Sequence, residues 1–367
     1  MSITEVRREA PEEAGEETPA IVAARKRSRG RETGPARRSE TDRGWYPADL
    51  VILAYLAVTG VLVIASPTRW AAKETYAGVH FVFLAAVLLL HYVRRSSSQP
   101  LHFVRHAYAF ASLPFFYWSV EQFHRLLVSG YFDNWIVGKE SLIFGCQPSQ
   151  ILHSAIPSIA LSEFLHLSYL VYLLLVPGVA LILYFSKRFA ALKEYTTTMM
   201  ATFLFCYAIF TIFPVRGPFY FFGPIDPNAK GVLFPQIVHR LLLRSASVGT
   251  AFPSSHVAAA VTVWIVSRRY LRRFSYGVLV IVVGIFVGTV YGGFHYALDA
   301  LCGLAVGIAF GLLGPKLHAW ICTLTGLAQS AAESVARTPS ASFSLRRAHA
   351  PAKHAAIARR GLLDDSK

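Results

Sequence analysis

The sequence predicts an all-α membrane protein, a polytopic helical bundle with about eight transmembrane spans. Of its 367 residues 54% are hydrophobic and only 16% are charged, whereas a typical soluble domain has about 25% charged residues. The mean hydropathy is +0.43. The apolar residues form runs close to the roughly 20 residues that a helix needs to cross the bilayer. Because one soluble core could not bury them all, these observations exclude an ordinary cytosolic enzyme.

Four regions are expected along the chain. Residues 1–48 carry 10 basic and 9 acidic side chains, a composition that predicts a disordered cytoplasmic tail. Residues 49–101 hold two additional transmembrane helices, residues 102–325 a six-helix core, and residues 326–367 a second disordered tail, which is basic. Seven to nine spans fit the pattern, and the eight that we prefer lie near residues 50–66, 76–93, 102–120, 165–186, 197–214, 252–267, 275–293 and 297–314.

The distribution of charge predicts the orientation in the membrane. The chain has 36 Lys and Arg against 21 Asp and Glu, a formal charge of +15. With eight spans, 27 of the basic residues lie on the side of both tails, 8 lie on the other side, and Arg105 lies within a span. The positive-inside rule places the side rich in Lys and Arg in the cytoplasm. We therefore expect a multi-pass protein of the cell (inner) membrane with both termini cytoplasmic, and the charge gives no reason to expect nucleic acid as a partner.

A candidate phosphate site lies at the start of the sixth span. Pro253 is followed by Ser254, Ser255 and His256 and then by an apolar run. Proline is favoured at the first helical position, so the two serines and His256 are expected in the first turn. Unpaired N–H groups and the helix dipole make such a turn a cradle for phosphate. The alternative is a simple helix start at the membrane interface.

A second cluster joins spans seven and eight at the same outer face. His295 and Asp299 are four residues apart, so on a helix they share one face. A carboxylate that holds one imidazole nitrogen leaves the other with a lone pair, as a histidine nucleophile requires. An acid within a membrane span is a functional candidate by default. The alternative is a structural His–Asp pair that ties two helices together.

A third candidate lies at the outer end of span five. Arg216 stands between Pro214 and Pro218, where the chain is stiff. A fixed guanidinium is a good clamp for phosphate, although Arg216 could instead reach to the lipid headgroups. Small residues recur every four positions in the last two spans, which predicts that these two helices pack tightly on each other. They are Gly284, Gly288, Gly292, Gly303, Gly307 and Gly311.

Other chemistries have less support. The four cysteines form no CxxC pair and suggest no disulfide framework. A haem protein needs opposed histidines within spans, but His91, His102 and His106 lie near one cytoplasmic turn. A metal-dependent lipid phosphotransferase needs several aspartates on one helix, and no span offers them. We therefore expect no metal and no cofactor.

These residues resemble the signatures of the type-2 phosphatidic acid phosphatase superfamily. Pro253–His256 is similar to its second motif, Pro-Ser-x-His, and His295–Asp299 to the His-x-x-x-Asp end of its third. The resemblance covers about residues 102–314. The Ser-Arg that usually precedes the third-motif histidine is replaced by Gly288 and Thr289, and Ile209 stands where the first motif has lysine. These departures resemble the branch of the inositol phosphorylceramide synthases, as does the outer stretch 144–148.

The resemblance implies a mechanism and a substrate class. His295 would be the nucleophile and form a phosphohistidine, Asp299 would hold its tautomer, and His256 would be the general acid and base. Arg216, Ser254 and Ser255 would bind the phosphate. The protein would move a phosphate or phospho-headgroup from a membrane lipid to a hydroxyl acceptor, as an inositolphosphotransferase of sphingolipid metabolism does. The alternatives are a lipid or prenyl (di)phosphate phosphatase that uses water, and an inactive transport or structural protein. The sequence leaves the oligomeric state open.

Overall fold

The computed structural model describes residues 45–65, 73–92, 98–225, 231–245 and 247–326, and within these ranges the chain is all-α. The two tails predicted from the sequence lie outside the described residues, apart from 45–48 and 326. The helices are α2 (Pro47–Ala65), α3 (Lys73–Tyr92), α4 (Gln99–Ala111), α5 (Leu113–Leu127), α6 (Asp133–Phe144), α7 (Pro148–Ala155), α8 (Ile159–Phe185), α9 (Phe189–Ile212), α10 (Pro218–Phe221), α11 (Phe234–Ser245), α12 (Ser255–Tyr270), α13 (Phe274–Tyr291) and α14 (Ala297–Leu324).

The prediction of an all-α membrane bundle is confirmed. Six of the described helices are long and apolar enough to cross a membrane: α2, α3, α8, α9, α13 and α14. The two other expected spans correspond to shorter helices. The span expected at 102–120 is divided at Ser112 into α4 and α5, and α12 has 16 residues. At 1.5 Å per residue α12 rises about 24 Å, which is less than the hydrocarbon thickness.

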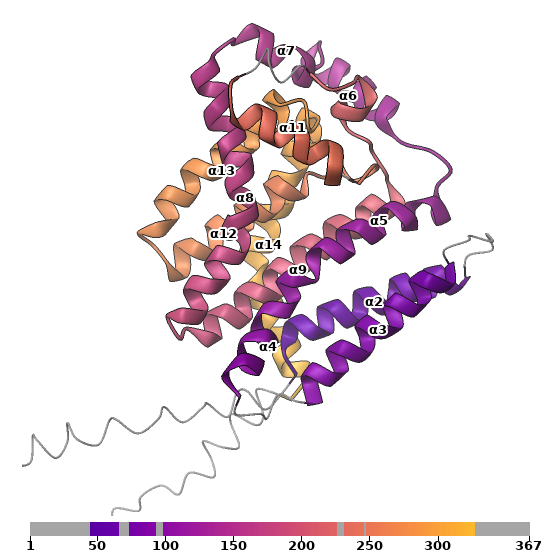
Figure 1. The fold of residues 1–367 in the computed structure, drawn as a ribbon, viewed down its shortest axis with the longest axis vertical. Helices are drawn as coiled ribbons and strands as arrows, with labels where there is room; N and C mark the ends of the chain where they lie inside the picture. Colours follow the sequence, from indigo (N-terminus) through magenta and orange to yellow (C-terminus); the bar gives the residue numbers. More distant parts are fainter. Residues whose placement is uncertain (1–44, 66–72, 93–97, 226–230, 246, 327–367) are drawn as a thin grey trace, which may run out of the picture.

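The bundle is built around α9. In its most apolar window 78% of the residues are buried, against 17% for the peripheral α3. Helices α2, α5, α8, α12 and α14 all contact α9, and α2 and α3 lie together at the edge of the bundle (Figure 1). Because the chain ends α9 at Ile212 and continues directly into Pro214–Pro218, this central helix delivers Arg216 to one end of the bundle.

The glycines of α13 and α14 pack against other helices, and the prediction that they bring α13 and α14 together is wrong. A Cβ on Gly288 would lie 3.0 Å from the carbonyl oxygen of Leu165 on α8. A Cβ on Gly303 or Gly307 would lie within 2.6 Å of backbone oxygens at the start of α12. The glycine spacing correctly indicates close packing, but it does not specify the partner. The close contact of α14 with α12 brings the start of α12 beside the start of α14.

A buried ion pair explains the charge that the sequence places inside a span. Arg105 on α4 donates two hydrogen bonds to the carboxylate of Asp49 on α2, with donor–acceptor distances of 3.0 and 2.5 Å. Tyr108 donates a third hydrogen bond to the same carboxylate. Both charged side chains are nearly inaccessible to solvent. The pair satisfies its own hydrogen-bonding capacity in the way that buried charges require, and it joins the additional helices to the core.

The two long connections that lie between the expected spans, residues 121–164 and 215–250, contain short helices. They form α6, α7 and α11, which lie together at one end of the bundle (top in Figure 1). The end of α9 and the starts of α12 and α14 lie at this same end. The polar clusters identified in the sequence are therefore covered by the short helices of these connections.

Candidate active site

The start of α12 contributes Ser254, Ser255 and His256. Ser254 is the N-cap, and its Oγ accepts a hydrogen bond from the backbone N–H of Val257 at 3.4 Å. The prediction that Pro253 is the first helical residue is therefore wrong: α12 begins at Ser255 and Pro253 follows Phe252 through a cis peptide bond. The reason is that the serine side chain supplies the cap. Ser254 is fully buried and faces its own helix, whereas Ser255 and His256 line a cavity.

The two candidate catalytic histidines face each other. Nδ1 of His256 and Nε2 of His295 are 3.5 Å apart. The other nitrogen of His256, Nε2, is hydrogen-bonded to the hydroxyl of Tyr169 at 3.1 Å, and the two rings are stacked with centroids 4.8 Å apart. Tyr172 covers another side of the His256 ring. The arrangement fixes His256 from α8 and leaves the edge that faces His295 for chemistry.

His295 lies in the turn between α13 and α14, beside Asp299. Its Nδ1 is 3.5 Å from Oδ2 of Asp299. The same Oδ2 accepts a hydrogen bond from the backbone N–H of Tyr296 at 2.9 Å. Among the described residues, neither Nδ1 of His295 nor Oδ1 of Asp299 has a hydrogen-bond partner. The two groups are thus adjacent but not closely joined, and a small rotation would form the His–Asp hydrogen bond.

Burial determines the charge of His295. The side chain is 7% exposed, and desolvation lowers its pKa to about 4, although the backbone carbonyl of Ala251 acts in the opposite direction. A pKa this low keeps the imidazole neutral at pH 7, so a lone pair is present on one ring nitrogen. With Nδ1 toward Asp299, that lone pair is expected on Nε2, which faces His256.

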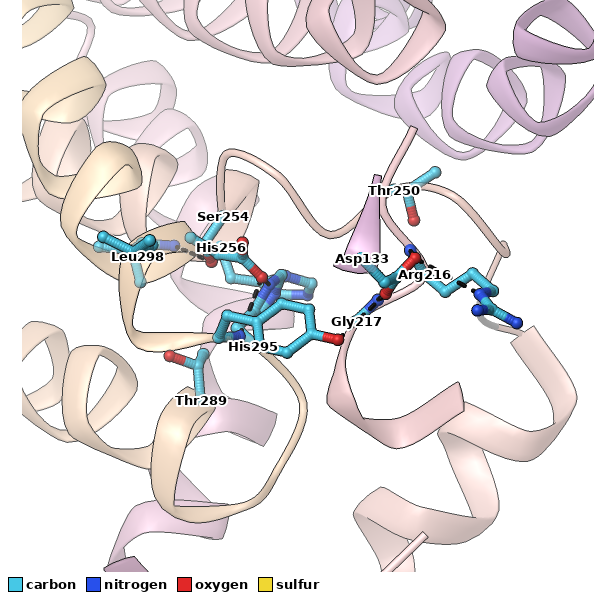
Figure 2. Close-up of polar contacts among 12 residues, drawn as sticks. Asp133, Arg216, Gly217, Thr250, Ser254, His256, Thr289, His295 and Leu298 are labelled. Atoms are coloured by element: carbon cyan, nitrogen blue, oxygen red, sulfur yellow. Dashed lines mark hydrogen bonds and ion pairs between the residues drawn. The ribbon is translucent and has the colours of Figure 1, made fainter. Parts of the chain in front are cut away.

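Arg216 reaches the site from the end of α9. Nε of its guanidinium and its backbone N–H lie 3.4 and 3.1 Å from Oδ2 of Asp133, which is buried. The rings of Tyr131 and Phe221 lie 5.2 Å from the guanidinium carbon. The side chain is 35% exposed, and in Figure 2 the guanidinium points away from the two imidazoles. The cation is therefore held at the edge of the site, with Asp133 as its partner.

The Arg216 loop touches the His295 turn at Gly217. The φ of Gly217 is 88°, which L-residues rarely adopt. A Cβ at this position would lie 3.0 Å from the carbonyl oxygen of Phe294 and 3.1 Å from Cβ of Ala251. The loop is also joined to the segment before α12, because the N–H of Ala251 donates to the carbonyl of Val215 at 2.9 Å. Glycine thus permits the three clusters to meet.

Two cavities join at His256. The smaller, of about 40 Å³, is bordered by Arg216, Thr250, His256 and His295. The larger, of about 450 Å³, extends between α5, α8, α9 and α11 and is lined almost entirely by aromatic and aliphatic side chains. The side chains common to both are Tyr117, Tyr169, Leu242, Ser247 and His256. The candidate catalytic histidine His256 therefore lies between a small cavity bordered by Arg216 and His295 and a large apolar one.

Gly288 and Thr289, the two residues that depart from the third motif, have roles in packing and backbone hydrogen bonding. Thr289 is fully buried, and its hydroxyl donates to the carbonyl of Phe286 at 3.1 Å, while its own carbonyl accepts the N–H of His295 at 3.0 Å. Gly288 lies against the backbone of Leu165. Neither position points a side chain at the histidines, so Arg216 is the nearest candidate for a phosphate-binding cation on the smaller cavity.

Sequence reasoning missed three residues that hold the site. Asp133 and Glu140 belong to α6, and neither lies in a motif; Tyr169 lies within the long apolar helix α8. A usable signal existed for the acids, since they stand seven residues apart and therefore share one helix face. Within the described part of the chain, no group of three or more His, Cys, Asp or Glu side chains is arranged to hold a metal ion.

Comparison with known proteins agrees with these motifs. Residues 142–313 match the family model of the PAP2 superfamily. No curated protein and no solved structure matches the chain. The matched part runs from the end of α6 into α14 and includes Arg216, both histidines and Asp299, whereas α2 to α5 lie outside it. The similarity indicates a lipid phosphatase or phosphotransferase type of function; it does not select the inositol phosphorylceramide synthase branch.

Proposed function

We propose that this protein is an integral membrane phosphoryl-transfer enzyme that moves a phosphate or phospho-headgroup from a lipid donor to a hydroxyl acceptor through a phosphohistidine. The observation that carries the proposal is the facing pair of histidines at the junction of the two cavities. A nucleophile, an acid–base group and a cation on one small cavity are the components of metal-free phosphoryl transfer.

In the first step Nε2 of His295 attacks phosphorus, and the bond from phosphorus to the leaving oxygen breaks. His256, when protonated, gives its proton to that oxygen, a role worth about 10²–10⁴-fold in rate. The positive charge that develops on His295 is stabilised by Asp299, whose carboxylate lies 3.5 Å from Nδ1. Arg216 turns from Asp133 toward the cavity to bind the phosphate oxygens, together with Ser255 and the N–H groups at the start of α12.

In the second step the acceptor hydroxyl takes the place of the leaving group. His256, now neutral, removes the hydroxyl proton while the oxygen attacks phosphorus, and the bond from phosphorus to Nε2 of His295 breaks. His256 is again protonated and His295 again neutral. If the acceptor is water, the same steps give a phosphatase; we favour a lipid or polyol hydroxyl because the Arg of the third motif is replaced by Thr289.

A lipid donor fits the larger cavity. Its volume of about 450 Å³ lies within the range of small-molecule sites, and its walls are the apolar faces of α5, α8, α9 and α11. An acyl or prenyl chain in this space would place its phosphate at His256 and in the smaller cavity. Because the chain would leave the hydrocarbon of the bilayer and not water, the cavity would select it by shape and packing and not by a hydrophobic driving force.

The proposed topology follows from the charges. Both termini are cytoplasmic, and the end of the bundle with α6, α7 and α11 lies on the extracytoplasmic side of the cell membrane. The enzyme would then act on lipids of the outer leaflet. If this orientation is correct, a reagent that acts only from outside intact cells should label a cysteine introduced at Lys139. The same reagent should not label a cysteine introduced at Lys193.

The experiment is incubation of the purified protein with a panel of ³²P-labelled lipids, with and without added hydroxyl acceptors. A new labelled phosphodiester lipid supports transfer, and free phosphate without an added acceptor supports the phosphatase. His295→Ala and His256→Ala are each expected to lose at least about 100-fold of the rate. Turnover by both variants at the wild-type rate would refute the mechanism, and no turnover of any lipid by the wild type would support the inactive alternative.

A further inference from the structure

Asp133 receives hydrogen bonds from both halves of the candidate active site. Its Oδ2 accepts the backbone N–H of Arg216, and its Oδ1 accepts the backbone N–H of Gly217, each at 3.1 Å. Its Oδ1 also accepts the hydroxyl of Tyr296 at 3.1 Å. Tyr296 directly follows His295 in the chain and caps α14. One buried carboxylate thus joins the Arg216 loop to the histidine turn (Figure 2).

Glu140, two turns further along α6, holds the start of α14. Its Oε1 accepts the backbone N–H of Leu298 at 3.0 Å, and the N–H of Ala297 contributes a second interaction. Its side chain is fully buried, and among the described residues its Oε2 has no hydrogen-bond partner. These amides belong to the first turn of α14, the turn that contains Asp299. Acceptors at this position satisfy N–H groups that a helix start leaves unpaired.

We propose that α6 sets the geometry of the active site, with Asp133 and Glu140 as positioning residues. Asp133 holds the Arg216–Gly217 backbone against the His295 turn, and Glu140 holds the first turn of α14, so that phosphate-binding and nucleophilic groups remain at a fixed separation. The effect on turnover rests on the proposed function, whereas the positioning itself does not. Asp133 and all but the last residues of α6 precede the part of the chain that matches the family model.

The chemistry of the contacts explains why position 133 needs an acid and position 140 needs only an accepting oxygen. The groups around Asp133 are all donors: two backbone N–H groups, the guanidinium Nε and a phenol. A carboxylate accepts at both oxygens, but an asparagine would turn its NH₂ group toward one set of these donors. The Glu140 contacts need only one accepting oxygen, which glutamine also has. Asparagine should therefore fail at position 133, and glutamine should succeed at position 140.

Amide hydrogen exchange tests the positioning without any substrate. In the full-length protein, Asp133→Asn is expected to speed exchange of the Arg216 amide or the Gly217 amide by about ten-fold or more, since the NH₂ group replaces the oxygen that one of them is bonded to. Pro214 and Pro218 have no N–H, so a peptide that covers this loop reports few other amides. The control is Glu194→Gln, which removes an acid that pairs with Arg269. Glu194 lies near the start of α9, about 27 Å along the helix from the end that leads to Arg216. Unchanged exchange in Asp133→Asn would overturn the inference.

A double-mutant cycle tests whether Asp133 acts through Arg216. Asp133→Asn should lower kcat by about 10- to 100-fold in the wild-type background, and by at least about five-fold less in the Arg216→Ala background. Equal losses in both backgrounds would indicate general destabilisation and overturn the role that we assign. If the wild type has no activity, the proposed function fails and the exchange measurement alone decides the positioning.

Rescue by the conservative variant tests Glu140. Glu140→Gln should keep kcat within about three-fold of the wild type, whereas Glu140→Ala, which leaves the α14 amides without an acceptor, should lose about ten-fold or more. A thermal melt of each variant separates this loss from unfolding. Loss of activity in Glu140→Gln equal to that in Glu140→Ala would show that the carboxyl group itself takes part in the reaction and would overturn the positioning role.

Discussion

The contact at Gly217 can be tested by adding a single methyl group. Gly217→Ala places a Cβ 3.0 Å from the carbonyl oxygen of Phe294 at a φ of 88°. With φ 88° and ψ 163° this residue lies in a backbone region that only glycine readily occupies, which costs another residue about 1–3 kcal/mol. Relief of the contact also requires the Arg216 loop to move by a few tenths of an ångström from the His295 turn. Since a misplacement of about 1 Å can cost 10²-fold in rate, we expect kcat/KM to fall by about ten-fold.

Gly223 provides the matched control. It lies in the same connection, has a φ of 97°, and a Cβ there would meet nothing within 4 Å. Gly223→Ala should therefore also lose stability through the strain of a positive φ, but it should keep its activity. The assay is turnover of a labelled lipid phosphate in detergent, with the melting temperature measured in parallel. If the two variants lose activity equally, backbone strain explains the result and the close approach of the two loops has no catalytic importance.

Four other predictions concern stability, pH dependence and the apolar cavity. Asp49→Asn leaves the buried guanidinium of Arg105 without its counter-charge and should destabilise the protein by about 3–5 kcal/mol, and a melting temperature equal to that of the wild type would contradict this. Burial raises the pKa of Glu140 from 4.5 to about 7, so between these pH values the folded state retains a proton that the unfolded state releases. The free energy of unfolding should therefore fall by about 1.4 kcal/mol for each unit of rising pH in this range. Glu140→Gln should abolish that slope. The lowered pKa of His295 keeps the imidazole neutral above about 4. The acid limb of kcat/KM for a phosphodiester substrate should therefore lie near pH 4, and an acid limb near pH 6.5 would refute the assignment. Leu242 lines both cavities, and Leu242→Trp narrows the space between them. This variant should raise KM for long-chain lipids by about ten-fold but leave KM for a short-chain analogue unchanged.

Local sequence patterns predicted the parts of the site that lie on one segment. The spacing of His295 and Asp299 predicted that the two side chains are neighbours, which they are, although His295 lies in the turn before α14 and not on the helix. The apolar run after Ser255 placed His256 at the start of α12. The exact cap was not predictable, because Pro253 and Ser254 are both acceptable at a helix start and the N-cap bond to Val257 decides between them. Local preference fixes such features to within one or two residues.

Long-range contacts could not be predicted from the sequence. Asp133 and Arg216 are 83 residues apart in the chain, and no periodic pattern connects α6 with the end of α9. The same limit explains the glycines of α13, whose spacing indicates a close helix contact but does not show that Leu165 of α8 supplies it. Pairing of distant segments depends on the complementarity of whole surfaces, which a single sequence does not display.

The central claim is that His295 carries the phosphoryl group, and trapping of the intermediate tests it most directly. The wild-type protein is mixed with a lipid labelled with ³²P at the transferred phosphate, quenched in alkali within a single turnover, and digested for mass spectrometry. We expect label on the peptide that contains His295, stable to alkali and lost in acid, and no label in His295→Ala. Product formation at the full rate with no label on the protein, or label on any other residue, would contradict it.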